Sequence, residues 1–89
     1  METENKKIGY HLREIKKGVL GKSSKILEEV EELMDAEEQD AKIMAIIELS
    51  DLVGAIRFYL DENAKGITLS DLEKMAEITK RAFDSGRRK

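Results

Sequence analysis

The chain has 89 residues, which is enough for one domain and too few for two hydrophobic cores. It contains no cysteine, so disulfide frameworks and thiolate metal sites are excluded, as fits a reducing compartment. A net charge of −3 argues against a nucleic acid polymer as partner, because such binding needs a basic surface.

Helix-forming residues dominate and proline is absent, which predicts an all-α fold. No apolar run approaches the ~20 residues that a membrane span needs. Residues 1–7 are polar and charged, unlike a signal sequence. We therefore expect a single domain over 1–89, no membrane partner and a cytoplasmic location.

The first part of the chain, 1–20, is predicted to form a short helix and a loop. Ile8, Leu12 and Ile15 have helical spacing, but glycines interrupt the pattern and favour a loop over 17–21. The first main helix is predicted over 25–38, with Ser23 or Ser24 as its N-cap.

The second main helix is predicted over 41–63, with Asp40 as its cap and Gly66 in the left-handed conformation after its end. The third is predicted over 69–85. Thr68 or Ser70 begins it, and Ser70 with Glu73 matches a capping box.

The second helix is apolar on nearly every side: 13 of the 18 residues over 43–60 are apolar. A chain of this length cannot surround such a helix by itself. The pattern therefore predicts a small helical bundle completed by a symmetric homo-oligomer, either a dimer or a tetramer.

Two carboxylates interrupt this apolar helix, Glu48 and Asp51, three residues apart. Buried carboxylates must be protonated, paired with cations or bound to metal. Arg57 is the one cation within the apolar stretch 43–60, and it points away from both. Glu29 and Glu32 repeat the spacing on the preceding helix, so two such pairs on antiparallel neighbours would form a cage of oxygen ligands. That cage suits Mg²⁺ or Mn²⁺ rather than zinc.

A plainer interpretation exists for several of these residues. The acidic run over 28–32, taken alone, fits a solvated helix face. The lysines at 16, 17, 22 and 25 fit ordinary surface residues as well as phosphate binding. His11 fits a surface or core position better than a catalytic one.

The two acidic motifs together resemble those of a known family. Residues 28–32 read E-E-x-x-E and residues 48–51 read E-x-x-D, with 15 residues between the motifs. This pattern resembles the MazG-like all-α nucleoside triphosphate pyrophosphohydrolases, which include phosphoribosyl-ATP pyrophosphohydrolase and the dimeric dUTPases. The resemblance covers 17–87, and 17–21 and 79–88 look like small stand-alone members from bacteria and phages.

The resemblance implies Mg²⁺-dependent hydrolysis of a nucleoside triphosphate to the monophosphate and pyrophosphate. The implied metal ligands are Glu29, Glu32, Glu48 and Asp51. Among the catalytic residues, Glu29 also acts as a ligand and Glu28 orients water or supports the ligands.

Some family members carry an Asn and a Lys-x-x-x-Arg pattern in the last helix, and this chain lacks a clean copy. The residues expected to bind substrate are Lys17, Lys25, Lys80 and Arg87. Two alternatives stay open: a catalytically silent helical dimer that binds proteins, and a hydrolase of a phosphoribosyl-nucleotide.

Overall fold

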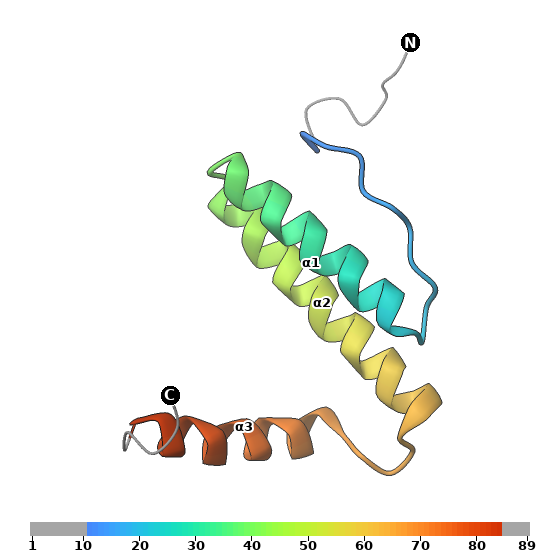
Figure 1. The fold of residues 1–89 in the computed structure, drawn as a ribbon, viewed down its shortest axis with the longest axis vertical. Coiled ribbons are helices and arrows are strands. Elements are labelled where there is room, and N and C mark those ends of the chain that lie inside the picture. Colours follow the sequence, from blue (N-terminus) through green and yellow to red (C-terminus); the bar gives the residue numbers. More distant parts are fainter. Residues whose placement is uncertain (1–10, 85–89) are drawn as a thin grey trace.

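The computed structural model describes residues 11–84 of the chain, and side chains over 11–80. Three helices follow one another, α1 (Ser23–Glu38), α2 (Lys42–Asn63) and α3 (Leu69–Asp84) (Figure 1). No strand occurs within 11–84, so the predicted all-α class is confirmed. Over the same residues, no helix combines the length and the apolar character needed to cross a membrane.

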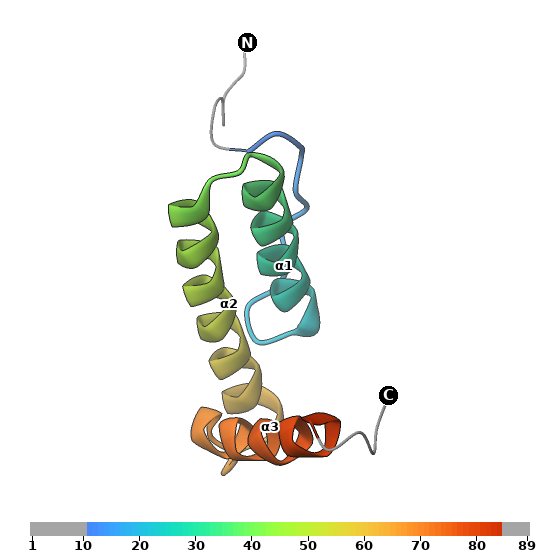
Figure 2. The same ribbon diagram turned by 90° about the vertical axis from the view of Figure 1, so that its left-hand side faces the viewer.

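α1 and α2 form an antiparallel hairpin, and α3 crosses the far end of α2 (Figures 1 and 2). The tight turn between α1 and α2 depends on Asp40, whose φ of 56° places it in the left-handed region. Asp40 was expected to cap α2, but the N-cap is Ala41 and makes no side-chain cap bond. Asp40 instead reverses the chain one residue earlier, where its backbone N–H donates to the carbonyl of Glu37.

The start of α1 also differs from the expected cap. The N-cap is Lys22, and no side chain caps the helix. Ser24 is engaged elsewhere, because its Oγ accepts a hydrogen bond of 3.0 Å from the N–H of Val19. The hydroxyl therefore holds the preceding turn against the helix start.

α3 begins with a reciprocal capping box, two residues before the predicted one. The N–H of Asp71 donates to Oγ1 of Thr68 at 3.1 Å, and the N–H of Thr68 donates to Oδ2 of Asp71 at 2.8 Å. This pair satisfies two N–H groups that the helix leaves free. Gly66 has a φ of 93°, which confirms the predicted left-handed residue after α2.

We call residues 11–18 the N-terminal strap, because they run in an irregular, extended path along α1 (Figure 1, blue). A short helix was expected in this part of the chain, but residues 11–22 contain none; residues 1–10 lie outside the described part. The physical reason is that α1 carboxylates accept N–H groups of the strap, as described below. Gly18 allows the close approach, since a Cβ there would lie 2.1 Å from the carbonyl oxygen of Ser24.

The apolar core of the described chain is small. Three apolar residues of the described chain are buried: Ala36, Ala55 and Leu60. By contrast, Ile43 and Ile46 of α2 are 76% and 62% exposed. In one copy of the chain, most apolar residues of α2 are therefore uncovered on the sides turned away from α1.

Candidate metal site

Four carboxylates meet between α1 and α2, and we call them the acidic cluster: Glu29, Glu32, Glu48 and Asp51. Each offers one oxygen, and these oxygens all lie within 4.8 Å of one another. The pairs meet because residues three apart share one helix face, and the two helices lie side by side. The structure thus brings together the four residues that the sequence spacing indicates.

The cluster is closed on one side and open on the other. Glu29 and Glu48 are 5% and 1% exposed, whereas Asp51 is exposed. Oε1 of Glu29 is buried and has no hydrogen-bond partner among the described residues. A buried carboxylate oxygen without a donor is costly, so this atom favours either a cation or a proton on a neighbouring carboxyl group.

The pKa of Glu32 reflects the repulsion between the carboxylates of the cluster. Burial and the neighbouring Glu48 and Glu29 carboxylates favour its protonated form and raise its pKa to about 8. A divalent ion among these oxygens would reverse that effect, because it favours the ionised carboxylate.

The donor set and its spacing fit a hard divalent cation. All four donors are carboxylate oxygens, the ligands that Mg²⁺ and Ca²⁺ prefer. Opposite oxygens lie about 4.2 Å apart around Mg²⁺ and about 5 Å apart around Ca²⁺, given their metal–oxygen distances. The upper bound of 4.8 Å on the distances between the cluster's oxygens is thus on the scale of a single ion's ligand shell.

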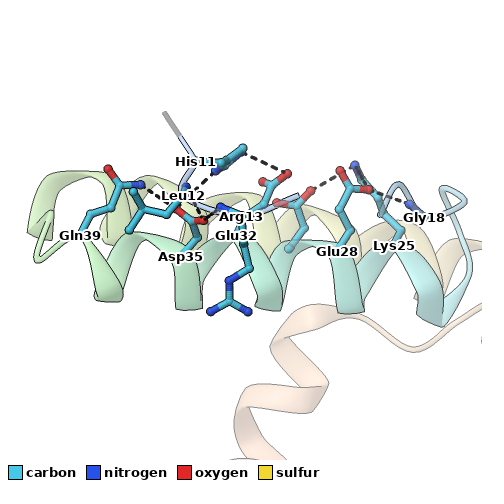
Figure 3. Close-up of polar contacts among 10 residues, drawn as sticks. His11, Leu12, Arg13, Gly18, Lys25, Glu28, Glu32, Asp35 and Gln39 are labelled. Atoms are coloured by element: carbon cyan, nitrogen blue, oxygen red, sulfur yellow. Dashed lines mark hydrogen bonds and ion pairs between the residues drawn. The ribbon is translucent and has the colours of Figure 1, made fainter. Parts of the chain in front are cut away.

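Lys25 supplies positive charge at the edge of the cluster. Its Nζ lies 3.1 Å from Oε1 of Glu28 (Figure 3) and 3.1 Å from Oε2 of Glu29. Burial alone would lower the pKa of Lys25, but its bonds to Glu29 and Glu28 outweigh burial and raise the pKa. Lys25, expected to bind substrate, is thus held charged beside a predicted metal ligand.

Glu28 is buried next to the cluster but is not part of it. Its Oε1 accepts the N–H of Gly18 at 2.9 Å as well as the Lys25 ammonium. Burial would raise the pKa of Glu28, but the Gly18 hydrogen bond and Lys25 together lower it. In this structure, the predicted catalytic Glu28 anchors one end of the strap and positions Lys25.

The other end of the strap is anchored by Asp35, which sequence reasoning missed. Asp35 is fully buried, and its Oδ2 accepts the N–H groups of Leu12 and Arg13 at 2.7 and 3.0 Å (Figure 3). Its Oδ1 accepts Nε2 of Gln39 at 2.6 Å. Burial would raise the pKa of Asp35, but the hydrogen bonds from Gln39, Arg13 and Leu12 lower it. The available signal was its position, seven residues after Glu28 and three after Glu32, on one helix face.

A pocket of about 380 Å³ opens beside the acidic cluster. Two cluster members line it, and most of the remaining wall is apolar or small. The lining residues are Leu20, Lys25, Glu29, Ser50, Asp51, Gly54, Ala55 and Phe58. The pocket could therefore hold a ligand group that touches both the carboxylates and an aromatic face.

The remaining residues expected to bind substrate are less closely placed. Lys17 is exposed on the strap and contributes to the lowered pKa of Glu28. Lys80 lies on α3, which contacts α2 but not α1 among the described residues. Arg87 lies outside the described residues.

Comparisons with protein-family models, with curated proteins and with solved structures give no match. The resemblance to MazG-like hydrolases therefore stays a prediction that depends on the two acidic motifs.

Proposed function

We propose that this protein is a Mg²⁺-dependent nucleoside triphosphate pyrophosphohydrolase, with Mn²⁺ as an alternative metal. The observation that carries the proposal is the acidic cluster, whose four ligand oxygens lie within 4.8 Å of one another. Within the same cluster, the buried Oε1 of Glu29 lacks a hydrogen-bond donor among the described residues, which supports a bound cation.

The reaction needs charge neutralisation and an in-line water more than covalent help. The four carboxylates of the cluster would hold Mg²⁺, which would supply charge neutralisation for the phosphates and acidify a water. Attack of a water on the α-phosphorus would form the new P–O bond while the bond to the bridging oxygen breaks; pyrophosphate would leave with the electron pair, and the proton of the water would pass to the solvent. The products are the monophosphate and pyrophosphate.

The chain's own side chains supply the rest of the site. Lys25, fixed by Glu28 and Glu29, neutralises phosphate charge next to the cluster. The adjoining pocket gives the nucleoside a place, with Phe58 as the aromatic surface against which a base can stack.

The proposal includes a homo-oligomer, either a dimer or a tetramer. Exposed apolar side chains continue from α2 onto α3, where Met75 and Ile78 are 60% and 63% exposed. Covering this surface with a second copy would bury what a single chain leaves in water. Light scattering should give at least twice the chain mass of 10.1 kDa. Ile46→Glu should shift the mass toward one chain, and a wild-type monomer at micromolar concentration would contradict the oligomer.

The enzymatic proposal is tested by pyrophosphate release. A panel of ribo- and deoxyribonucleoside triphosphates and one phosphoribosyl-nucleotide is incubated with Mg²⁺ or with EDTA. Release should require Mg²⁺ and disappear in Asp51→Asn, whereas Asp61→Asn, an exposed carboxylate of α2 outside the cluster, should behave like wild type.

A second candidate function is a catalytically silent helical dimer that binds proteins. The exposed apolar residues of α2 and α3 favour it, because they suit a protein partner as well as a second copy. Absence of pyrophosphate release from every nucleotide of the panel would support this candidate against the enzyme.

A further inference from the structure

His11 lies at the point where the strap meets the acidic cluster. Its side chain is 15% exposed, and each ring nitrogen faces a different carboxylate of α1 (Figure 3). Nδ1 lies 3.8 Å from Oδ1 of Asp35, and Nε2 lies 4.0 Å from Oε2 of Glu32. The imidazole thus stands between a residue of the strap anchor and a member of the cluster.

The backbone that follows His11 is held by Asp35. Asp35 is fully buried and accepts the backbone N–H groups of Leu12 and Arg13, the two residues that follow His11. These bonds fix the backbone next to His11 as well as the carboxylate that its Nδ1 faces. The strap therefore fixes the backbone that follows His11, and it brings the ring to the edge of the cluster.

We propose that His11 is a positioning residue of the acidic cluster, clamped by Asp35 so that its Nε2 orients the carboxylate of Glu32 toward Glu29, Glu48 and Asp51. Both ring distances, 3.8 Å to Asp35 and 4.0 Å to Glu32, are longer than a hydrogen bond, so the orienting contact would need a rotation of the Glu32 side chain. An orienting partner behind a ligand limits the ligand's rotation and typically changes metal affinity by 10–100-fold. This inference depends on the metal site proposed above.

The experiment measures Mn²⁺ affinity on the full chain by the electron paramagnetic resonance signal of free Mn²⁺. His11→Ala removes both contacts, His11→Asn retains a polar group near Asp35 only, and His11→Gln retains one near Glu32. We expect His11→Ala and His11→Asn to weaken Mn²⁺ binding by about 10-fold or more, and His11→Gln to restore much of the loss.

Arg13→Ala is the matched control, because it removes a different contact of the strap, the ion pair between Arg13 and Glu38. This variant should bind Mn²⁺ like wild type. An equal loss in Arg13→Ala and His11→Ala would show general loosening of the strap and overturn the proposal. Unchanged affinity in His11→Ala would overturn it too, while Mn²⁺ binding by wild type would leave the metal site intact. No Mn²⁺ binding by wild type would overturn both.

A second measurement on the wild-type chain decides the matter if the variants do not fold. His11 is the single histidine of the sequence, so its ring resonances are unambiguous in NMR spectra. They should shift on addition of Mg²⁺ and saturate together with metal binding. Ring resonances that stay fixed while Mg²⁺ saturates the protein would overturn the positioning role.

Discussion

Nζ of Lys25 lies 3.1 Å from Oε2 of Glu29, one helical turn further along α1, while Oε1 of the same carboxylate is buried without a hydrogen-bond partner among the described residues. One carboxylate is thus neutralised from one side only. The second oxygen therefore stays available to a cation, as the proposed metal site requires.

Replacing Glu48 with Gln should separate activity from stability. Glu48 is 1% exposed, so the substitution removes a buried charge and a predicted ligand at once. We expect pyrophosphate release to fall by about 10³-fold, since losing metal-based charge stabilisation costs several kcal/mol. The metal-free protein should be as stable as wild type or more stable in urea unfolding. The control is Glu37→Gln, which replaces an exposed carboxylate of α1 and should change neither activity nor stability. Strong destabilisation by Glu48→Gln would indicate that Glu48 pairs with a buried cationic group.

Divalent metal should stabilise the fold, because four clustered carboxylates repel one another without it. At 100 times its dissociation constant, the metal contributes about 2.7 kcal/mol, which raises the Tm of a chain of this size by roughly 10 °C or more. The check is a thermal scan with Mg²⁺ or Mn²⁺ against NaCl of equal ionic strength. A Tm that does not change at millimolar metal would count against the site.

The pH dependence of stability should report on Glu32. Its pKa rises from 4.5 to about 8 in the folded chain, so the folded state binds more protons than the unfolded state between these values. Stability of the metal-free protein from this group is therefore full below about pH 4.5 and is lost as the pH rises through 8. Urea unfolding from pH 5 to 9 should show this fall, and Glu32→Gln should flatten it.

The lowered pKa values of Asp35 and Glu28 act in the opposite direction, because their stabilisation is lost as the pH falls below their ordinary range. Saturating Mg²⁺ should also flatten the fall above pH 5, since the ion keeps Glu32 ionised. A slope that Glu32→Gln leaves unchanged would assign the effect to another group.

Removing the Asp35 carboxylate should release the strap from α1. Asp35→Ala leaves the N–H groups of Leu12 and Arg13 without their acceptor, which should cost roughly 2–4 kcal/mol in the free energy of unfolding. Hydrogen exchange should show faster exchange at these two amides. The control Glu38→Ala breaks an exposed ion pair on the same strap and should cost about 1 kcal/mol or less. Equal losses in the two variants would mean that Asp35 is not a special anchor.

The all-α class could be predicted because apolar spacing and glycines report directly on helices and their ends. The four residues of the acidic cluster could be grouped from the sequence. Carboxylates in apolar surroundings need charge compensation, and the spacing of Glu29 and Glu32 repeats that of Glu48 and Asp51. Their role as metal ligands stays a prediction. The strap could not be predicted, because its conformation depends on hydrogen bonds that its N–H groups donate to Asp35 and Glu28, which lie 10–23 positions away in the sequence. The predictions of Asp40 and Ser24 as helix caps were wrong for a similar reason. Asp40 takes up the left-handed conformation of the turn before α2, and the hydroxyl of Ser24 accepts the N–H of Val19 in the turn before α1.

The acidic cluster comes entirely from residues 29–51, two consecutive helices joined by the tight turn at Asp40. Its assembly therefore requires no closure of a long chain segment, and contacts of short sequence separation form fast. The hairpin that carries the acidic cluster can therefore form early in folding, before α3 has docked. In that order of folding, the acidic cluster forms before α3 completes the apolar surface that a second copy would cover.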